Sequence, residues 1–172
     1  MLVMGILNVT PDSFSDGGEF ATVETAVAHG IEMLNDGADI IDIGGESTRP
    51  GAQRVTEEEE LSRVIPVITQ LAAQGAVISI DTMRASVARA AIAAGAKFIN
   101  DVSGGMADET MHQVAAELKV PYILMHWRGH SKDMNSKAIY SDVVAEVIAE
   151  LKQQIDKALT AGISKDDLII DP

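Results

Sequence analysis

The chain has 172 residues and no cysteine, which excludes disulfide bonds and metal sites built from thiolates. The absence suits a reducing compartment, so the cytoplasm is the default location. No apolar run approaches the roughly 20 residues that a membrane-spanning helix needs, and no membrane partner is expected. Met1 leads directly into a short apolar segment without a signal-peptide pattern.

Positive charge is also scarce. The sequence has 13 lysine and arginine residues against 26 aspartate and glutamate residues, for a net charge of −13. Because a phosphate backbone requires a basic surface, nucleic acid is excluded as a partner. The acidic run Glu57–Glu60, at a predicted helix start, is interpreted as surface charge that serves solubility. An anionic substrate would need local help from a few arginines, helix N-termini or a divalent metal ion.

What the sequence does contain is a repeated order of helix, glycine, short apolar strand and polar residue. We expect strands over residues 3–7, 40–43, 77–80, 98–100, 122–125 and 168–170, and helices over 23–36, 56–74, 85–94, 109–118 and 141–161. Pro66 should kink or divide the second helix. The strands are brief, continuous apolar runs, which are typical of parallel strands covered on both faces.

Strict alternation of strands and helices predicts either a (β/α)8 barrel or an open doubly wound sheet. Both folds place ligand sites at the carboxyl ends of the strands. The similar segments 35–42 and 94–101 favour a barrel built from repeated units. Six strands do not close an eight-stranded barrel. We therefore expect one TIM-barrel domain over residues 1–172, truncated after strand six, either as a fragment or as a domain that needs a partner.

Polar residues end all six predicted strands and should share one rim: Asn8, Asp42, Asp81, Asn100, His126 and Asp171. Asp81 alone could be a helix N-cap. Asn100 and Asp171 have the same placement, however, which favours one pocket over three separate caps. Two carboxylates and an amide that converge suit a ring with adjacent N–H donors and an acceptor, such as the 2-amino-4-oxo face of a pterin.

Four motifs carry a resemblance to a known family. Residues 5–18 read Gly-Ile-Leu-Asn-Val-Thr-Pro-Asp-Ser-Phe-Ser-Asp-Gly-Gly, an apolar strand that opens into a polar, flexible loop. Residues 44–51 (Gly-Gly-Glu-Ser-Thr-Arg-Pro-Gly), 100–105 (Asn-Asp-Val-Ser-Gly-Gly) and 169–172 (Ile-Ile-Asp-Pro) follow later strands. Together they resemble dihydropteroate synthase, the folate-pathway enzyme that joins a pterin to p-aminobenzoate.

The resemblance implies a set of pterin ligands. Asp171 would bind the amino and N3–H donors of the ring, and Asn100 and Asp81 would meet its other edge. Met125 would pack against the ring, although an ordinary core methionine is the alternative reading of that residue.

The resemblance also implies roles for two loops. Thr48 would contact the pterin diphosphate, while Arg49 and Pro50 would border the p-aminobenzoate site; a solvent-exposed Gly-Pro turn is the alternative. Phe14 would cover p-aminobenzoate, and Asp16 would stabilise the developing positive charge.

Asn8 is implied to bind Mg2+ together with the diphosphate of the substrate, a turn-forming asparagine being the alternative. The implied reaction is a dissociative displacement of diphosphate by the arylamine, with Asp16 and Asp81 as catalytic residues. The family is typically homodimeric. Its later strands carry a Ser-Arg-Lys motif and an Arg-x-His pair that this chain does not contain, so we expect the chain alone to be inactive or barely folded.

Other functions remain open: a non-catalytic pterin-binding paralogue, a pterin-binding methyltransferase domain, or a generic phosphate-binding barrel. The loop at residues 48–50 weighs against the first, and the run at residues 8–16 against the second. No chemical step is assigned to a polar and aromatic cluster that follows the fifth strand and comprises His126, Trp127, Arg128 and His130. His29 and His112 are expected on helix surfaces or in grooves.

Overall fold

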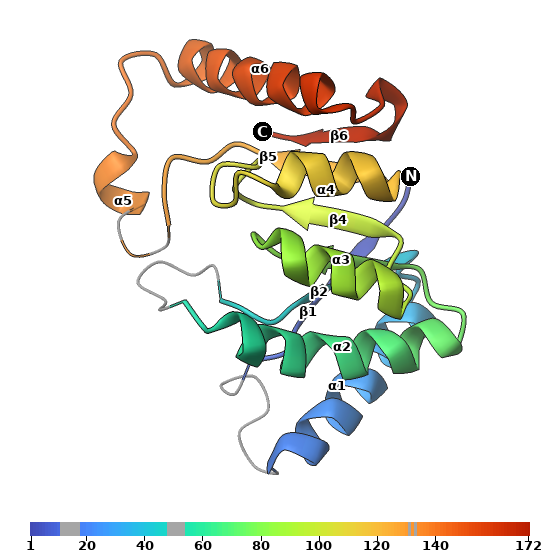
Figure 1. Cartoon of the computed structure of the whole chain (residues 1–172). Helices are drawn as coiled ribbons and strands as arrows, with labels where there is room; N and C mark the ends of the chain where they lie inside the picture. The colour runs from blue at the N-terminus through green and yellow to red at the C-terminus, as the bar shows by residue number, and fades with distance from the viewer. Residues whose placement is uncertain (11–17, 48–53, 131, 133) are drawn as a thin grey trace.

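The computed structural model describes residues 1–10, 18–47, 54–130, 132 and 134–172 (Figure 1). Its strands are β1 Met4–Asn8, β2 Ile40–Gly44, β3 Ile78–Asp81, β4 Phe98–Asp101, β5 Tyr122–Met125 and β6 Leu168–Asp171. They form one sheet in the order β1-β2-β3-β4-β5-β6, and every neighbouring pair is parallel. The predicted strands are confirmed, because none of their ends is displaced by more than one residue.

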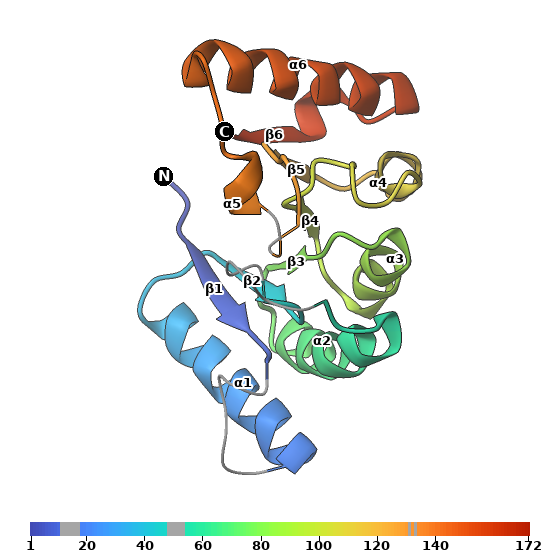
Figure 2. The ribbon, with the colours of Figure 1, turned by 90° about the vertical axis from the view of Figure 1, so that its left-hand side faces the viewer.

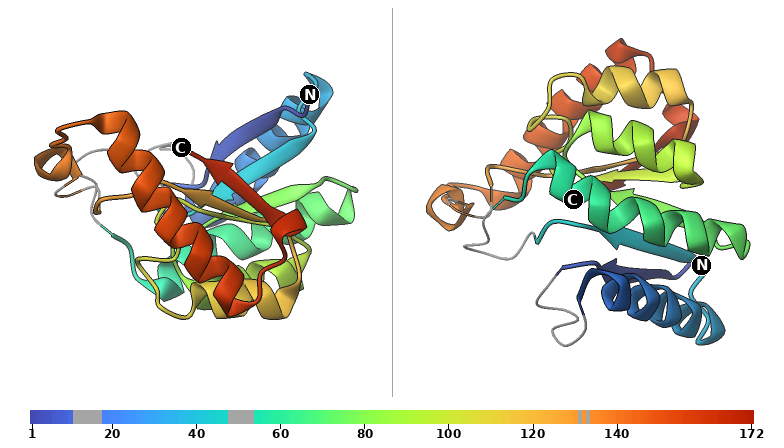
Figure 3. Two further views of the ribbon diagram at one scale, coloured as in Figure 1. Left: turned by 90° about the horizontal axis from the view of Figure 1, so that it is seen from above. Right: turned by 60° about the horizontal axis from the view of Figure 1, so that its bottom comes forward.

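The helices are α1 Gly18–Asn35, α2 Glu57–Ala73, α3 Ala85–Ala94, α4 Met111–Leu118, α5 Met134–Lys137 and α6 Val143–Ala161, with a 3-10 turn at Lys165–Asp167. The long helices form an arc around the outside of the sheet, each packed against the next (Figure 2). Seen from above, α6 runs beside β6 (Figure 3). Within the described ranges, no helix is long and apolar enough to cross a membrane.

Helix α2 begins where the sequence predicts. The hydroxyl of Thr56 accepts a 3.2 Å hydrogen bond from the Glu59 N–H, as an N-cap does. The predicted division at Pro66 is wrong, because the helix runs unbroken from Glu57 to Ala73. Proline removes one backbone donor, and the fully buried side chains Val64 and Leu71 on either side hold the two halves on the sheet.

Side-chain alternation along the strands gives the sheet two different faces. Leu7, Ile43, Ile80, Ile99 and Tyr122 pair in one row on the helix-facing side, and each is at most 1% exposed. Burying such a side chain contributes about 1.5–3 kcal/mol, so this row anchors the core. The residues one position further along each strand point to the inner face, away from the described helices.

The prediction that both faces are covered is correct only in part. On the inner face Ser79 is fully buried by the curvature of the sheet, whereas Ile6 is 66% exposed. Strand β1 pairs only with β2, and β6 only with β5, so the sheet does not close on itself. Six parallel strands with helices outside and a polar inner face are the architecture of part of a (β/α)8 barrel.

Candidate functional site

A row of polar residues crosses the inner face at the carboxyl ends of the strands, the end that faces the viewer in Figure 2. Asn8 pairs with Gly44, Gly44 with Asp81, and Asp81 with Asn100. Gly44 has no side chain, and its neighbours lean over it. A Cβ atom placed on Gly44 would lie 3.2 Å from Asp81 Oδ2 and 3.5 Å from Asn8 Oδ1. The structure thus brings the predicted metal ligand and a predicted pterin ligand together.

Asp42 lies two residues before Gly44 on β2 and therefore on the same face. Its Oδ2 accepts a 2.9 Å hydrogen bond from the side-chain amide of Asn100. Because the NH2 group of Asn100 is used in this bond, its Oδ1 is left as an acceptor. Among the residues that the structure describes, this atom and Asp42 Oδ1 are buried without a hydrogen-bond partner. An unsatisfied buried polar group costs roughly 1–3 kcal/mol, so two adjacent ones indicate a site for a ligand with N–H donors.

The carboxylates of this face have perturbed acidities. Burial raises the pKa of Asp81 well above its ordinary value, and the nearby Asp42 and Asp101 carboxylates raise it further. Burial also raises the pKa of Asp42. Desolvation and mutual repulsion both oppose ionisation, and a bound ligand that donates hydrogen bonds or carries positive charge would relieve both.

Met125 and Asp171 pair with each other across β5 and β6. Two residues earlier on β5, Ile123 pairs with Asn100 of the polar row. The strand period of two therefore places Met125 and Asp171 on the same inner face as Asn100 and Asp81. Met125 is half-buried and Asp171 is exposed. All four predicted pterin residues share one face at one end of the sheet, and their roles as ligands stay predictions.

The alternative role for Asp81, a helix N-cap, is wrong. The N-cap position of α3 is Arg84, which makes no side-chain capping bond. The first N–H of that helix, at Ala85, donates a 2.8 Å hydrogen bond to the carboxylate of Asp108 instead. Asp81 is thus left for the inner face.

Five predicted site residues lie outside the described part of the chain: Phe14, Asp16, Thr48, Arg49 and Pro50. Their assignments to the p-aminobenzoate and diphosphate sites stay predictions.

Asp101, next to Asn100, was not predicted as a site residue. It points to the helix-facing side, fully buried, and accepts hydrogen bonds from the Ser103 N–H and hydroxyl, the Gly105 N–H and the Tyr122 hydroxyl, at 2.7–2.8 Å. These four bonds fix the turn after β4, in which Gly105 has a positive φ of 82°. Asp101 therefore holds Asn100 in place from the opposite face. The Asn-Asp-Val-Ser-Gly-Gly motif was the signal for it.

His112 is only 8% exposed, so a surface position is wrong, but the groove prediction is confirmed, because the residue lines a cavity between α4 and α6 together with Gln113 and Lys157. The His112 Nε2 lies 3.1 Å from the carbonyl oxygen of Gly104, and since a carbonyl only accepts, Nε2 carries the proton. The ring meets that of Tyr122 edge-on at 5.6 Å. Burial lowers the pKa of His112. The surface prediction for His29 is confirmed by a side chain that is 48% exposed.

Glu60 was interpreted as surface charge, and this is also wrong, because the residue is only 1% exposed. Its Oε1 accepts a 2.6 Å hydrogen bond from the Thr82 hydroxyl, and its other oxygen is ion-paired with Arg84. Burial raises its pKa. The spacing of Glu60 from Val64 and Leu71 places it on the buried stripe of α2, a periodicity that the run of four glutamates conceals.

The cluster after β5 fixes a loop. Arg128 donates to Glu150 at 2.6 Å and to Glu146 at 2.7 Å, and its guanidinium stacks 3.8 Å from the centre of the Tyr140 ring. His126 Nε2 lies 2.8 Å from Glu150 Oε2. These contacts bind His126 and Arg128 to α6.

The parallel sheet, its outer helices and the polar strand ends define a (β/α) protein of the TIM-barrel type. Residues 4–172 match the family described as pterin binding enzyme, and the chain belongs to this family.

Individual relatives are more specific. The dihydropteroate synthase of Mycobacterium leprae is 53% identical over 171 residues, which cover 99% of this chain and 60% of the relative. A solved structure of Xanthomonas albilineans dihydropteroate synthase with 4-aminobenzoic acid is 54% identical with a TM-score of 0.91, and the match covers 99% of this chain and 60% of that one. Another, in complex with 7,8-dihydropteroate, is 49% identical with a TM-score of 0.86, at the same coverage.

This chain therefore spans about 60% of the length of the relatives it matches. The likeness confirms the fold class: six βα units of the TIM-barrel type, in register with part of a longer barrel.

Proposed function

We propose that this chain forms the pterin-binding part of a dihydropteroate synthase. The reaction condenses 6-hydroxymethyl-7,8-dihydropterin diphosphate with p-aminobenzoate and releases 7,8-dihydropteroate and diphosphate. The observation that carries the proposal is the pair of buried, unsatisfied acceptors on Asn100 and Asp42, beside the carboxyl group of Asp81. The relatives and their aminobenzoate and dihydropteroate complexes support the same reaction.

The pterin ring offers N–H donors on an edge that carries both amino and ring nitrogens. Asn100 Oδ1 and Asp42 Oδ1 supply acceptors that are buried without a hydrogen-bond partner among the described residues, and the Ser79 hydroxyl lies beside Asp42 as a further polar group. Asp81, with its raised pKa, is ready to share a proton with a ring nitrogen or to become ionised when a donor arrives. Asp171 and Met125 share the same face, where a carboxylate could receive the amino group and a thioether could pack on the ring.

The donors above Gly44 fit Mg2+. Asn8 Oδ1 and Asp81 Oδ2 are hard oxygen donors, and Asn8 is exposed to incoming water and phosphate. Among the described residues, no group of three or more His, Cys, Asp or Glu could hold a metal ion, and Mg2+ usually takes only one or two protein oxygens and completes its shell from phosphates and water. Asn8 would hold the ion, which when bound would neutralise charge on the departing diphosphate.

The side chains then have simple tasks. Asp81, Asn100 and Asp42 orient the ring so that its electrons can spread the positive charge that develops on the methylene group. Asp16 is predicted to stabilise that charge, and Phe14 to exclude water from it. The attacking arylamine is already unprotonated at neutral pH, so no strong general base is required. Homodimerisation of a longer protein and a cytoplasmic location stay predictions.

Calorimetry on the chain tests the proposal. We expect binding of the pterin diphosphate in the presence of Mg2+, weakened at least tenfold by Asp81→Asn and unchanged by the exposed control Asp36→Asn. Asn8→Ala should weaken the diphosphate form but leave 6-hydroxymethylpterin unaffected, and chelation of Mg2+ should have the same selective effect. A chain that is folded but binds neither pterin would refute the proposal. Pterin binding without any p-aminobenzoate binding in the presence of diphosphate would favour the non-catalytic module.

A further inference from the structure

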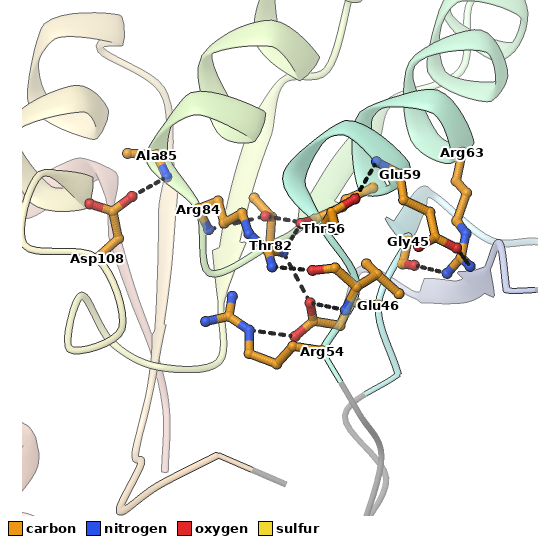
Figure 4. Close-up of polar contacts among 12 residues, drawn as sticks. Gly45, Glu46, Arg54, Thr56, Glu59, Arg63, Thr82, Arg84, Ala85 and Asp108 are labelled. Carbon is orange, nitrogen blue, oxygen red and sulfur yellow. Dashed lines mark hydrogen bonds and ion pairs between the residues drawn. The ribbon is translucent and has the colours of Figure 1, made fainter. Parts of the chain in front are cut away.

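Glu46, which follows β2, joins three segments of the chain through one carboxylate (Figure 4). Its Oε1 accepts a 3.0 Å hydrogen bond from Arg54 Nε. Its Oε2 accepts from the Val55 N–H at 3.3 Å and from Arg84 Nη1 at 3.0 Å. Residue 46 lies before, and residues 54 and 55 after, the segment that includes the predicted substrate residues 48–50. Both ends of that segment therefore meet at Glu46.

Arg84, in the turn between β3 and α3, completes this arrangement. Besides Glu46, its guanidinium is ion-paired with Glu60 of α2, and its Nη2 donates to the carbonyl oxygen of Val55. Only 17% of the arginine side chain is exposed, and its two glutamate partners are 8% and 1% exposed. The planar guanidinium group of Arg84 thus contacts Glu46 before the segment, Val55 after it, and Glu60 of helix α2.

The same cluster is continuous with the pterin site. Thr82, which follows Asp81 directly, donates its hydroxyl hydrogen to Glu60, and its oxygen accepts a 3.1 Å hydrogen bond from the Arg84 N–H. The turn that carries Asp81 is therefore fixed by the groups that hold residues 46 and 55. On the other side of the cluster, Arg63 Nη1 donates a 2.8 Å hydrogen bond to the Gly45 carbonyl oxygen and so secures the end of β2 to α2.

Stability alone is a poor explanation for such a cluster. Burying two carboxylates and a guanidinium carries a desolvation cost that well-packed apolar side chains of the same volume avoid. What the ionic arrangement adds is direction, because Arg84 donates to partners in three separate segments at fixed angles. These directional hydrogen bonds reach both ends of the segment that is predicted to border p-aminobenzoate.

We propose that Arg84 is a positioning residue that acts through Glu46. It holds Glu46 and Val55, which lie before and after the segment that includes residues 48–50, against the turn after Asp81 and thereby sets the affinity for the second substrate, p-aminobenzoate, rather than for the pterin. The inference rests on the function proposed above for its substrate and on the described contacts for its geometry.

The test compares Arg84→Met and Arg84→Lys with Arg89→Met. Arg89 is an arginine of α3 that is 51% exposed and paired with Glu117 at the surface. With the pterin site saturated, we expect Arg84→Met to weaken p-aminobenzoate binding at least tenfold and to change pterin binding less than threefold. Arg84→Lys should restore part of the loss, since lysine keeps the charge but not the fork, and Arg89→Met should match the original chain.

Trypsin supplies a readout that does not depend on substrates. Arg54 and Val55 are held by Glu46 and Arg84, so cleavage after Arg54 should become at least tenfold faster in Arg84→Met at a urea concentration where the variant remains folded, and it should stay unchanged in Arg89→Met. If Arg84→Met does not fold, Glu46→Gln replaces it, with the same expected directions. Equal losses of pterin and p-aminobenzoate affinity, or unchanged cleavage, would overturn the proposal. If the original chain binds no pterin, the proposed function fails. The cleavage rates still decide whether Arg84 holds Glu46 and Val55 together.

Discussion

The side-chain amide of Asn100 donates a 2.9 Å hydrogen bond to Asp42, which lies two strands away in the sheet. This bond settles the orientation of the amide, because only its NH2 group can donate to a carboxylate. The carbonyl oxygen of Asn100 must then point elsewhere, and it is buried with no partner. Asp42 therefore determines which hydrogen-bonding group Asn100 presents to a ligand.

We expect Asp42→Ala to weaken pterin binding by about tenfold, because the Asn100 amide loses the partner that orients it and one acceptor disappears. Isothermal titration calorimetry with 6-hydroxymethylpterin measures this effect. Asp36→Ala, at an exposed position after α1, is the control and should bind as the original chain does. Unaltered affinity in a folded Asp42→Ala chain would show that the Asn100 orientation does not depend on Asp42.

Gly44→Ala should impair binding while leaving the fold almost intact. The new methyl group would lie 3.2 Å from Asp81 Oδ2 and 3.5 Å from Asn8 Oδ1, so both side-chain ends must move aside. These ends are flexible, and we expect a loss of stability below about 1 kcal/mol with a loss of pterin diphosphate affinity of about tenfold. Urea unfolding and calorimetry on the same preparation separate the two effects.

The neighbouring Gly45→Ala is the matched control, since its side chain points to the opposite face. Its methyl group would meet Val64 at 2.9 Å and the backbone oxygen of Glu60 at 3.3 Å. Helix α2 cannot yield as a side chain does, so this variant should lose about 2 kcal/mol of stability. If Gly45→Ala lost affinity while Gly44→Ala lost stability, the assignment of the two faces would be reversed.

Much of the fold follows from the sequence because the relevant signals are local. Short apolar runs, glycine stops and the Thr56 cap predict the strands to within one residue and most of the helices, although α1 begins five residues earlier than the predicted residue 23 and the short helix α5 was not predicted. Parallel pairing then brings strand ends together, and this is sufficient to gather Asn8, Asp81 and Asn100 into one row. The inner-face site is thus a consequence of periodicity and topology.

The features that the sequence did not reveal depend on packing between distant segments. Glu60 lies within an acidic run that appears solvated, but Thr82 and Arg84 reach it from 22 and 24 residues away. His112 is buried because α4 lies on the turn that Asp101 organises. No local pattern indicates that a charged residue will find such partners, so composition favoured the surface in both cases.

His112 should give the chain a stability that depends on pH in a defined direction. Burial lowers its pKa below the usual 6.5, so the folded state binds fewer protons than the unfolded state in the range below that value. The contribution of neutral His112 to the free energy of unfolding is complete above pH 6.5, and it is lost as the pH falls through the lowered folded-state pKa. His112→Gln keeps a donor near the Gly104 oxygen but cannot titrate.

Urea unfolding at pH 7.5, 6.5 and 5.5 measures this contribution as the difference between the original chain and His112→Gln. We expect the advantage of the original chain to shrink as the pH falls. His29→Gln, at an exposed position on α1, controls for the loss of a histidine as such. A difference that stayed constant over the three pH values would mean that His112 does not titrate differently in the two states.

Asp81→Asn should have opposite effects on stability and binding. Burial raises the folded-state pKa of Asp81 well above its ordinary 3.8, so the folded state binds more protons than the unfolded state between these two values. Stability therefore falls as the pH rises through this window, and above it the ionised carboxylate carries its full cost. Asparagine cannot ionise, and the variant should be more stable than the original chain at pH 8, by an amount that shrinks toward pH 4.

The same variant should lose pterin affinity, since a site that binds a ligand keeps a group that the empty fold tolerates poorly. Unfolding curves at pH 4, 6 and 8 measure the stability difference between Asp81→Asn and the original chain. A variant less stable than the original chain at pH 8 would contradict the burial of an ionisable Asp81.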